Sequence, residues 1–394
     1  MDDILEKKAF LLIIPISVLI FNALIIFNPT PIILAARAGA ILWFNNVLPS
    51  LLPFMIGTNI LLKLGVVNFI GVMLEPIMRP LFGVSGKGAL ALAMGAASGY
   101  PIGAQVCASL REDGKISQVE TQRLLSFVNN SGPLFMIGAI GAGMFGNARI
   151  GYFILVSNLA GAILSGVLFK FYRRSRVEDG RSEKKSRGLF KEIKYAERNK
   201  HMPFGKILSE SILGAVQSLL LIAGFIIFFS VLLKILEITG VIDIATGLLY
   251  GLGVPGGRDL IGGAIYGFFE ITNGASRLAE LGASRGVIVL CAALVSFGGM
   301  SIFSQSIAFL SKTDIKPSIF FISKLLNAVF TATVGFLIYP LWNFEIIAPA
   351  FAPGPVNKLV FSTVICAMVI FAILITVFAA NVSSALRNKK MGDY

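Results

Sequence analysis

The sequence predicts an all-α polytopic membrane protein, with about eight transmembrane helices and two re-entrant helical hairpins arranged as two inverted repeats. Composition is the first reason: 56% of the 394 residues are hydrophobic and 14% are charged, whereas a soluble chain carries about 25% charged residues. The 41 glycines suit close helix packing in lipid. The second reason is that apolar segments interrupted by Gly and Pro recur in corresponding places of the two halves, which is typical of secondary transporters.

The first half is predicted to contain an N-terminal transmembrane helix and one complete repeat. Residues 1–30 hold the N-terminal helix, and residues 31–172 form the first gate repeat. About 20 apolar residues are needed to cross the bilayer core, so shorter pieces are assigned to the interface. The predicted elements are, in order, spans at Phe10–Phe27 and Ala38–Leu64 (bent by Pro49 and Pro53), an interfacial piece at Phe69–Phe82, a re-entrant hairpin at 88–110, and spans at Thr121–Phe145 and Ile150–Tyr172.

The second half repeats this order after a basic loop at residues 173–206. Residues 207–341 form the second gate repeat, and residues 342–394 hold the final transmembrane helix and a basic tail. Two short matches share an offset of 171 residues: Leu61-Leu62-Lys63 with Leu232-Leu233-Lys234, and Gly103-Ala104 with Gly274-Ala275. The predicted elements are spans at Ile207–Leu236, Val287–Leu310, Ile319–Leu341 and Lys358–Asn381, an interfacial piece at Ile244–Gly253 and a re-entrant hairpin at 260–281.

Charge indicates how the chain is oriented. Residues 173–206 contain twelve Lys/Arg and five Asp/Glu, which is about half of the net charge of +13. Loops with an excess of Lys and Arg stay in the cytoplasm. A nucleic-acid-binding surface is disfavoured, because this segment has few apolar residues with which to fold. If both hairpins return to their own side, both termini lie inside, the first hairpin opens inward and the second opens outward.

Cysteine and histidine limit the chemistry. His201 is the only histidine and lies in the basic loop, while Cys107, Cys291 and Cys366 stand singly in apolar stretches. A Ser-His-Asp or Cys-His catalytic site, a histidine metal site or a disulfide framework is therefore not expected. We predict a protein that is not an enzyme and needs no cofactor or metal. Its expected partners are the lipid bilayer and a small anionic substrate, with a proton or sodium ion for coupling and no nucleic acid; a homo-oligomer stays open.

Four polar interruptions are predicted to meet at the bilayer midplane and to form the binding site. Unwound backbone survives at membrane depth only inside protein or beside a water-filled cavity. Half-helix N-termini would attract anions there, and amide and hydroxyl side chains would add partners. The simpler reading, that Gly and Pro only pack or kink helices, is disfavoured for four related positions. The candidate substrate-binding residues are Gly99, Tyr100, Pro101, Gly103, Gln105, Asn129, Asn130, Ser131, Gly132, Thr272, Asn273, Gly274, Gly299, Ser301, Ser304 and Gln305.

Two ionisable residues inside apolar segments need separate interpretation. Glu270 lies deep in the second hairpin, and an intramembrane carboxylate is a functional candidate. It is the candidate for binding a coupling ion or proton. The structural alternative is an ion pair with Arg277, if the chain turns at Asn273-Gly274 and places the two residues on facing arms. Lys324 lies within a span, where it could attract an anion, but extension of its amine toward the interface is favoured.

Four motifs carry a resemblance to a known family. Gly99-Tyr100-Pro101-Ile102-Gly103-Ala104, Asn129-Asn130-Ser131-Gly132-Pro133, Glu270-Ile271-Thr272-Asn273-Gly274 and Gly298-Gly299-Met300-Ser301 resemble the YlbJ (SpoVV) family of sporulation integral membrane proteins. The wider group shares the nucleoside-recognition, or gate, domain and is distantly similar to concentrative nucleoside transporters. The resemblance implies a spore-forming bacterium, a multi-pass protein of the outer forespore membrane, and movement of dipicolinic acid from the mother cell toward the forespore.

Two other functions stay open at this point. Within transport, the substrate could instead be a nucleoside or another small metabolite. Outside transport, the protein could be a membrane scaffold in spore assembly that recruits partners through residues 173–206. A transporter should bring polar residues together at the midplane, whereas a scaffold should tolerate their loss.

Overall fold

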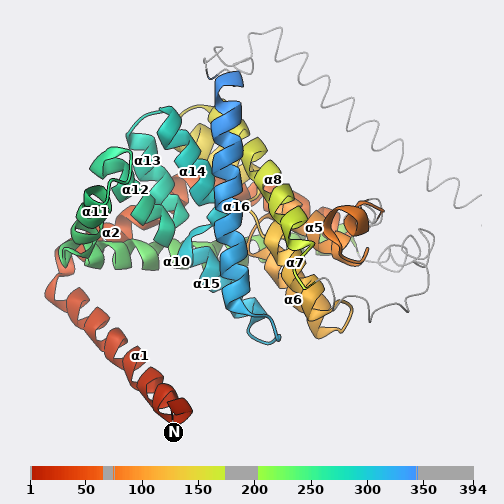
Figure 1. The fold of residues 1–394 in the computed structure, drawn as a ribbon, viewed down its shortest axis with the longest axis horizontal. Coiled ribbons are helices and arrows are strands. Elements are labelled where there is room, and N and C mark those ends of the chain that lie inside the picture. Colours follow the sequence, from red (N-terminus) through yellow and green to blue (C-terminus); the bar gives the residue numbers. More distant parts are fainter. Residues whose placement is uncertain (1, 65–73, 75, 174–202, 343, 345–394) are drawn as a thin grey trace, which may run out of the picture. The chain divides into compact units, whose positions relative to one another are not determined.

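The computed structural model describes residues 2–64, 74, 76–173, 203–342 and 344, and these residues form helices joined by turns, without a strand (Figure 1). The N-terminal helix α1 (Asp2–Phe27) precedes the first repeat. The first repeat then comprises α2 (Pro29–Leu42), α3 (Leu48–Lys63), α5 (Gly88–Ser98), α6 (Ile102–Glu112), α7 (Gln118–Val128) and α8 (Ala148–Phe169), with π-helical stretches η1 (Trp43–Val47), η2 (Met78–Phe82) and η3 (Phe135–Met144).

The second repeat follows the same order. It comprises α10 (Phe204–Ile238), α11 (Val241–Gly251), α12 (Gly257–Phe269), α13 (Ile271–Glu280), α14 (Arg285–Phe297), α15 (Gly299–Leu310) and α16 (Pro317–Ile338), closed by a 3₁₀ turn at Tyr339–Leu341. Each repeat thus contains a long span, a short helix, a two-helix hairpin, an interrupted span and a last span of 22 residues, α8 or α16. The described residues follow the predicted order of elements, and the predicted interfacial piece at Phe69–Phe82 is described only at residues 74 and 76–82.

Five helical segments among the described residues are long and apolar enough to cross a membrane. They are Pro29–Leu61, Ala148–Phe169, Phe204–Ile238, Arg285–Leu310 and Pro317–Leu341. The protein is therefore an all-helical polytopic membrane protein. The predicted span at Phe10–Phe27 falls on α1, whose described apolar part, Pro15–Phe27, is shorter than these. The predicted span at Thr121–Phe145 is divided into α7 and η3. The prediction for Lys358–Asn381, and most of the basic loop, lie outside the described residues.

Corresponding spans of the two repeats run antiparallel against each other. Along the first spans, Gly39 packs against Ser230, and the Asn59 amide donates to Ser211 O at 3.1 Å. Residue numbers increase along α2 and α3 in the direction in which they decrease along α10, so these helices are antiparallel. Along the last spans, Gly161 packs at Thr331 and the Trp342 indole donates to Arg149 O at 3.2 Å. Figure 1 shows α16 crossing beside α8. Antiparallel packing of equivalent spans is expected of repeats related by an axis in the membrane plane.

Glycine allows the two arms of each hairpin to approach closely. In the first hairpin, a Cβ on Gly95 would lie 3.4 Å from Gly103 Cα on the other arm. In the second, a Cβ on Gly274 would overlap the backbone of Gly267. Small residues at such crossings replace side-chain packing with backbone contact. Each hairpin is therefore a closely packed pair of helices.

α7 is polar in sequence yet buried on most of its length. Its N-terminus carries a capping box, in which the side chains of Ser117 and Glu120 each accept a hydrogen bond from the other's backbone N–H. Arg123, 2% exposed, donates to Gly83 O at 2.7 Å and to Tyr172 O at 2.7 Å. A buried guanidinium requires such partners. These bonds tie α7 to the end of α8 and leave its C-terminal residues to form the break at 129–133.

Candidate binding site

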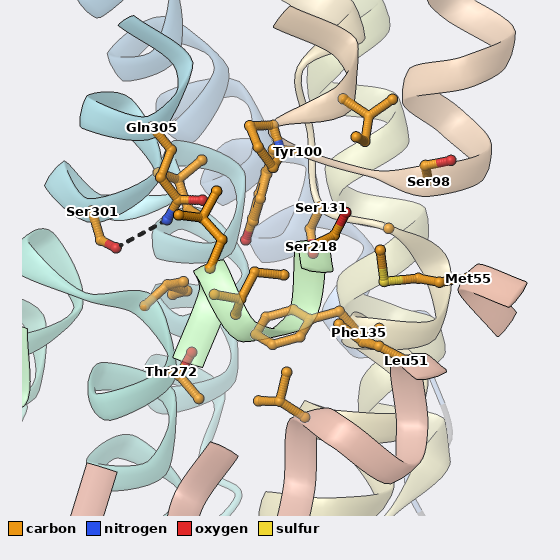
Figure 2. Close-up of a pocket in the computed structure, with 18 of the residues that line it drawn as sticks. Leu51, Met55, Ser98, Tyr100, Ser131, Phe135, Ser218, Thr272, Ser301 and Gln305 are labelled. Carbon is orange, nitrogen blue, oxygen red and sulfur yellow. Dashed lines mark hydrogen bonds between the residues drawn. The ribbon is translucent and has the colours of Figure 1, made fainter. Parts of the chain in front are cut away.

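A cavity of about 260 Å³ lies where the interruptions of both repeats meet (Figure 2). Residues from both hairpins, both interrupted spans, η1, α3 and α10 line it. Drug-sized ligands occupy pockets of roughly 300–1,000 Å³, so this cavity suits a smaller solute. Its polar lining residues are Ser98, Tyr100, Gln105, Ser131, Gln217, Ser218, Glu270, Thr272, Ser301 and Gln305.

The tip of the first hairpin rests on the break of the first interrupted span. The Tyr100 N–H donates to Asn130 O at 2.7 Å, and a Cβ on Gly99 would lie 2.9 Å from Gly132 Cα. Gly99 has φ +75°, a conformation that favours glycine. The two unwound segments thus form a backbone hydrogen bond with each other. Backbone polar groups within the membrane need such partners because no water is available there.

The second repeat shows the equivalent contact. α14 ends at Gly298, with φ +89°, and α15 begins at Gly299, with φ +76°. A Cβ on Gly299 would lie 3.2 Å from Phe269 O and 3.3 Å from Ile271 N, the residues on either side of the hairpin turn. A Cβ on Gly298 would meet the Tyr100 ring at 3.6 Å. All four predicted interruptions are therefore brought together, across the repeats as well as within them.

Glu270 caps the second arm of its own hairpin. Its carboxylate accepts from Thr272 N at 3.0 Å and from Asn273 N at 2.7 Å, and the Asn273 amide adds a third bond at 2.9 Å. The residue is 2% exposed and borders the cavity. These N–H groups are the unpaired donors that begin α13, and a negative charge is stabilised at this end of a helix.

The structure shows where this hairpin turns. The chain turns at Glu270, and Asn273 and Gly274 belong to the first turns of α13. The predicted alternative, an ion pair between Glu270 and Arg277, is wrong: the Arg277 guanidinium lies 3.9 Å from the centre of the Tyr266 ring. The physical reason is that three donors at the start of α13 already bond the carboxylate, which leaves Arg277 to stack on an aromatic face.

Lys324 does not extend to the interface, contrary to the sequence prediction. Its side chain is 2% exposed, and its Nζ donates to Asn129 O at 2.7 Å and to Asn130 Oδ1 at 3.1 Å. Asn327, one turn further along α16, donates to the same Asn130 oxygen at 2.7 Å. Free carbonyl oxygens at the break provide partners that an unbroken helix lacks, and this is why the amine stays buried.

Several buried polar atoms around the cavity have no hydrogen-bond partner of normal geometry among the described residues. On the lining these are Tyr100 Oη, Ser131 Oγ and Gln305 Oε1. Figure 2 shows the Tyr100 ring between Gln305 and Ser131, with Gln305 donating to Ser301 at 3.4 Å. Buried polar atoms are normally paired, so this group of oxygens indicates a place where a ligand or water supplies partners.

The predicted set divides into lining and supporting residues. Tyr100, Pro101, Gln105, Ser131, Gly132, Thr272, Ser301 and Gln305 line the cavity, together with Glu270. Gly99, Gly103, Asn129, Asn130, Asn273, Gly274, Gly299 and Ser304 are not among its lining residues. The Asn130 amide donates to Phe127 O at 2.6 Å and the Asn129 amide to Ser306 Oγ at 3.0 Å, so both side chains support the break.

Sequence reasoning missed the contribution of the long spans. Gln217 and Ser218 of α10 line the cavity, as do Leu51, Phe54 and Met55 of α3. The polar pair Gln217-Ser218 inside a 35-residue apolar helix was an available signal. The apolar residues of α3 gave no such signal, because in an apolar helix a residue that lines a cavity and a residue that faces lipid are of the same type.

A second cavity, of about 490 Å³, continues from the first toward one end of the first hairpin. The two share Met55, Ser98, Ile102, Gln105 and Ser218, and the second extends to the exposed residues Asp113 and Lys115. Asp113 and Lys115 form an ion pair at 2.7 Å. The shared lining places the second cavity between the first cavity and the loop that joins α6 and α7.

Comparisons with known proteins agree with this architecture. Residues 44–148 match the Gate family, described as nucleoside recognition. This region contains α3, the first hairpin, α7 and η3. The chain is 38% identical over 352 residues, 86% of its own length and 85% of the relative's, to the sporulation integral membrane protein YlbJ of Bacillus subtilis (strain 168). No solved structure matches the chain. Identity at this level over nearly the whole of both proteins shows that the chain belongs to the family of the sporulation integral membrane protein YlbJ.

Proposed function

We propose that this protein is a secondary transporter of a small anionic metabolite, and that dipicolinic acid, moved from the mother cell toward the forespore, is its substrate. The proposed location is the outer forespore membrane. The observation that carries the proposal is the cavity at the meeting point of four interrupted segments, where Tyr100 Oη, Ser131 Oγ and Gln305 Oε1 are buried without a hydrogen bond of normal geometry among the described residues. Leaving such an atom unpaired costs about 1–3 kcal/mol, a cost that a polar ligand would remove.

The charge distribution around the cavity supports an anionic substrate indirectly. Lysine and arginine are absent from the lining that the structure describes. Lys324 lies behind the break at 129–130, and Ser131 and Gly132, the next residues, reach the cavity. A buried ammonium acts over a longer range than an exposed one, because the surrounding dielectric is low. The Tyr100, Ser131 and Thr272 hydroxyls and the glutamine amides would supply the direct hydrogen bonds to carboxylate oxygens.

The arrangement of the cavities supports alternating access. The second cavity, which adjoins the buried one, reaches Asp113 and Lys115 at one end of the first hairpin. For inverted repeats, the opposite path would open when the second hairpin takes the equivalent position. We propose an elevator-like or rocking movement of the two hairpins and interrupted spans against the long antiparallel spans. Glu270 is the proposed coupling-ion or proton group, because it borders the cavity and is buried without an ion-pair partner among the described residues.

A nucleoside or other uncharged polar metabolite is the second candidate. Two observations favour it: the match to the nucleoside-recognition family over residues 44–148, and a described lining whose direct partners are hydroxyls and amides. Such groups recognise a neutral heterocycle as readily as a carboxylate.

The test is a direct binding measurement on the purified full-length chain in lipid nanodiscs. Dipicolinate, its ring-carbon analogue isophthalate, and a set of nucleosides are titrated separately by calorimetry. The proposal predicts saturable binding of dipicolinate and weaker binding of isophthalate, because a site built for the ring nitrogen loses that partner. Nucleoside binding without dipicolinate binding would establish the second candidate.

Proteoliposome counterflow separates transport from a scaffold role. Radiolabelled substrate should exchange across vesicles that contain the protein and not across empty vesicles. Absence of binding and of exchange for every compound, in protein shown to be folded, would overturn transport and leave the scaffold reading.

A further inference from the structure

The Lys324 ammonium has the surroundings of a bound metal cation. Its two partners are oxygens of the unwound segment: the Asn129 carbonyl at 2.7 Å and the Asn130 amide oxygen at 3.1 Å. No described carboxylate forms an ion pair with it. A structural lysine in lipid normally reaches water at the interface or pairs with a carboxylate. Lys324 does neither, so its charge is balanced by oxygen dipoles alone.

The oxygen atoms at this break are held in place independently of the lysine. Asn130 O accepts from the Tyr100 N–H, and Asn130 Nδ2 donates to Phe127 O. The Asn327 amide donates to Asn130 Oδ1 at 2.7 Å. Two further buried oxygens, Asn129 Oδ1 and Asn327 Oδ1, have no partner among the described residues. The side chains of these two residues therefore carry acceptor oxygens that no described donor uses.

Oxygen-rich unwound backbone is the chemistry that binds alkali cations in membranes. Carbonyl oxygens at interrupted helices coordinate Na⁺ in transporters, and carbonyl oxygens replace the hydration shell of K⁺ in channels. A lysine ammonium presents one positive charge to the same oxygens without the need to remove an ion from water. It is also attached to the chain, which raises its effective concentration.

We infer that the break at Asn129-Asn130 is a monovalent-cation site that the ammonium group of Lys324 fills. A consequence is that the protein needs no Na⁺ or K⁺ at this position. Removal of the ammonium while the space remains should convert the break into a site for Na⁺ or K⁺. The inference concerns the cation alone and does not depend on the identity of the transported substrate or on transport itself.

The test uses the purified full-length protein in nanodiscs and measures its melting temperature. The chloride salts of Na⁺, K⁺ and choline are compared at equal ionic strength, because choline is too large for the site. Lys324→Ala removes the ammonium and leaves space. We expect Na⁺ or K⁺ to raise its melting temperature saturably above that in choline, by at least about 2 °C. The wild-type protein should show no such difference.

Matched variants separate cation binding from general salt effects. Lys324→Met fills the space with an apolar chain of similar length and should show no specific response. Lys234→Ala removes a lysine whose ammonium is 3.0 Å from Glu237 at a partly exposed position, and it should show none either. If Lys324→Ala yields no folded protein, Lys324→Gln provides the test, because it adds an oxygen ligand without charge and should show the Na⁺ or K⁺ response.

Two results would overturn the inference. One is a folded Lys324→Ala or Lys324→Gln protein whose melting temperature is the same in all three salts. The other is a saturable Na⁺ response in the wild-type protein that Asn130→Ala abolishes, since this would show that a free ion, and not the lysine, occupies the break.

Discussion

The Glu270 carboxylate accepts a hydrogen bond of 2.7 Å from the Asn273 N–H, so the positive end of α13 is bonded by a residue of its own chain. The general expectation was that half-helix N-termini at the midplane would bind an anionic substrate. At the second hairpin the internal carboxylate takes that position. Recognition of a substrate therefore depends more on side-chain donors around the cavity, and Glu270 becomes the group whose change of charge would alter the start of α13.

Substitutions of Glu270 should separate its capping role from its charge. Glu270→Ala removes every acceptor at the start of α13 and should cost about 0.5–2 kcal/mol of stability, the range for a lost cap. Glu270→Gln keeps one acceptor oxygen and should cost less, yet it should alter the pH or ion dependence of transport if Glu270 is the coupling group. Thermal unfolding and proteoliposome transport across a pH series measure the two effects. A pH and ion profile equal to that of the wild type would leave Glu270 with a structural role only.

Two tyrosines provide a matched pair for the cavity. The Tyr100 hydroxyl is buried in the cavity without a partner of normal geometry among the described residues, whereas the Tyr266 hydroxyl donates to Glu237 at 2.7 Å. Tyr100→Phe should leave stability unchanged and weaken binding of an anionic ligand by roughly 10- to 100-fold, the equivalent of about 1.5–3 kcal/mol. Tyr266→Phe should lower stability by about 1 kcal/mol and leave affinity unchanged. Calorimetry and thermal unfolding of both variants check this pattern, and equal affinities for wild type and Tyr100→Phe would remove Tyr100 from the site.

Glycine at the crossing of the second hairpin should be required for folding. A Cβ on Gly274 would overlap the backbone of Gly267, so Gly274→Ala must push α12 and α13 apart. We expect a loss of about 1–3 kcal/mol, typical of overpacking, or failure to insert. The control is Gly247→Ala in α11, where a Cβ meets nothing within 4 Å and where helix propensity favours alanine. Detergent-resistant yield and melting temperature are the measurements; equal behaviour of the two variants would contradict the close crossing.

Arg111 and Asp314 should contribute stability that depends on pH. The two side chains form paired hydrogen bonds of 2.8 Å outside the spans, and the Arg111 guanidinium holds the pKa of the Asp314 carboxyl below its ordinary value of 3.8. The contribution is therefore present above the ordinary value and disappears as pH falls through the lowered one. Because Asp314 is about half exposed, Asp314→Asn should cost no more than about 1 kcal/mol at neutral pH. Melting temperatures of both proteins should converge in acid and at high salt; a constant difference would exclude the ion pair as the cause.

The antiparallel spans lead to a topology prediction. Cysteines introduced at residues 112–116 should react with membrane-impermeant reagents from the cytoplasm, and those at 282–284 from the opposite side. The basic loop sets the inside, and the antiparallel arrangement of α3 with α10 and of α8 with α16 sets the inversion. Cys107 and Cys291 are buried, but Cys366 should be replaced by Ser first to remove background. Labelling of both sets from one side would end the inverted arrangement.

The sequence by itself determined the class of protein and the four segments in which the helices are interrupted. Gly and Pro inside apolar runs are local signals, because they change backbone geometry wherever they occur. The break at 129–133, the turn at Gly99–Pro101 and the junction at Gly298-Gly299 therefore fall where the residues predict. The fourth falls at the first residue of the predicted Glu270–Gly274 segment, because the capping bonds of Glu270 make Asn273-Gly274 helical.

Only the tertiary structure decided which residues line the cavity and which support it. Asn130 and Ser131 are neighbours in the chain, yet one side chain is bonded to α16 and the other reaches the cavity. Lys324 is buried because oxygens from a segment 194 residues away meet it, and Gln217 joins the cavity because α10 packs against α3. Each of these outcomes depends on contacts between distant segments. Local sequence fixes where a helix is interrupted, but the partners of an interruption are set by which helices pack beside it.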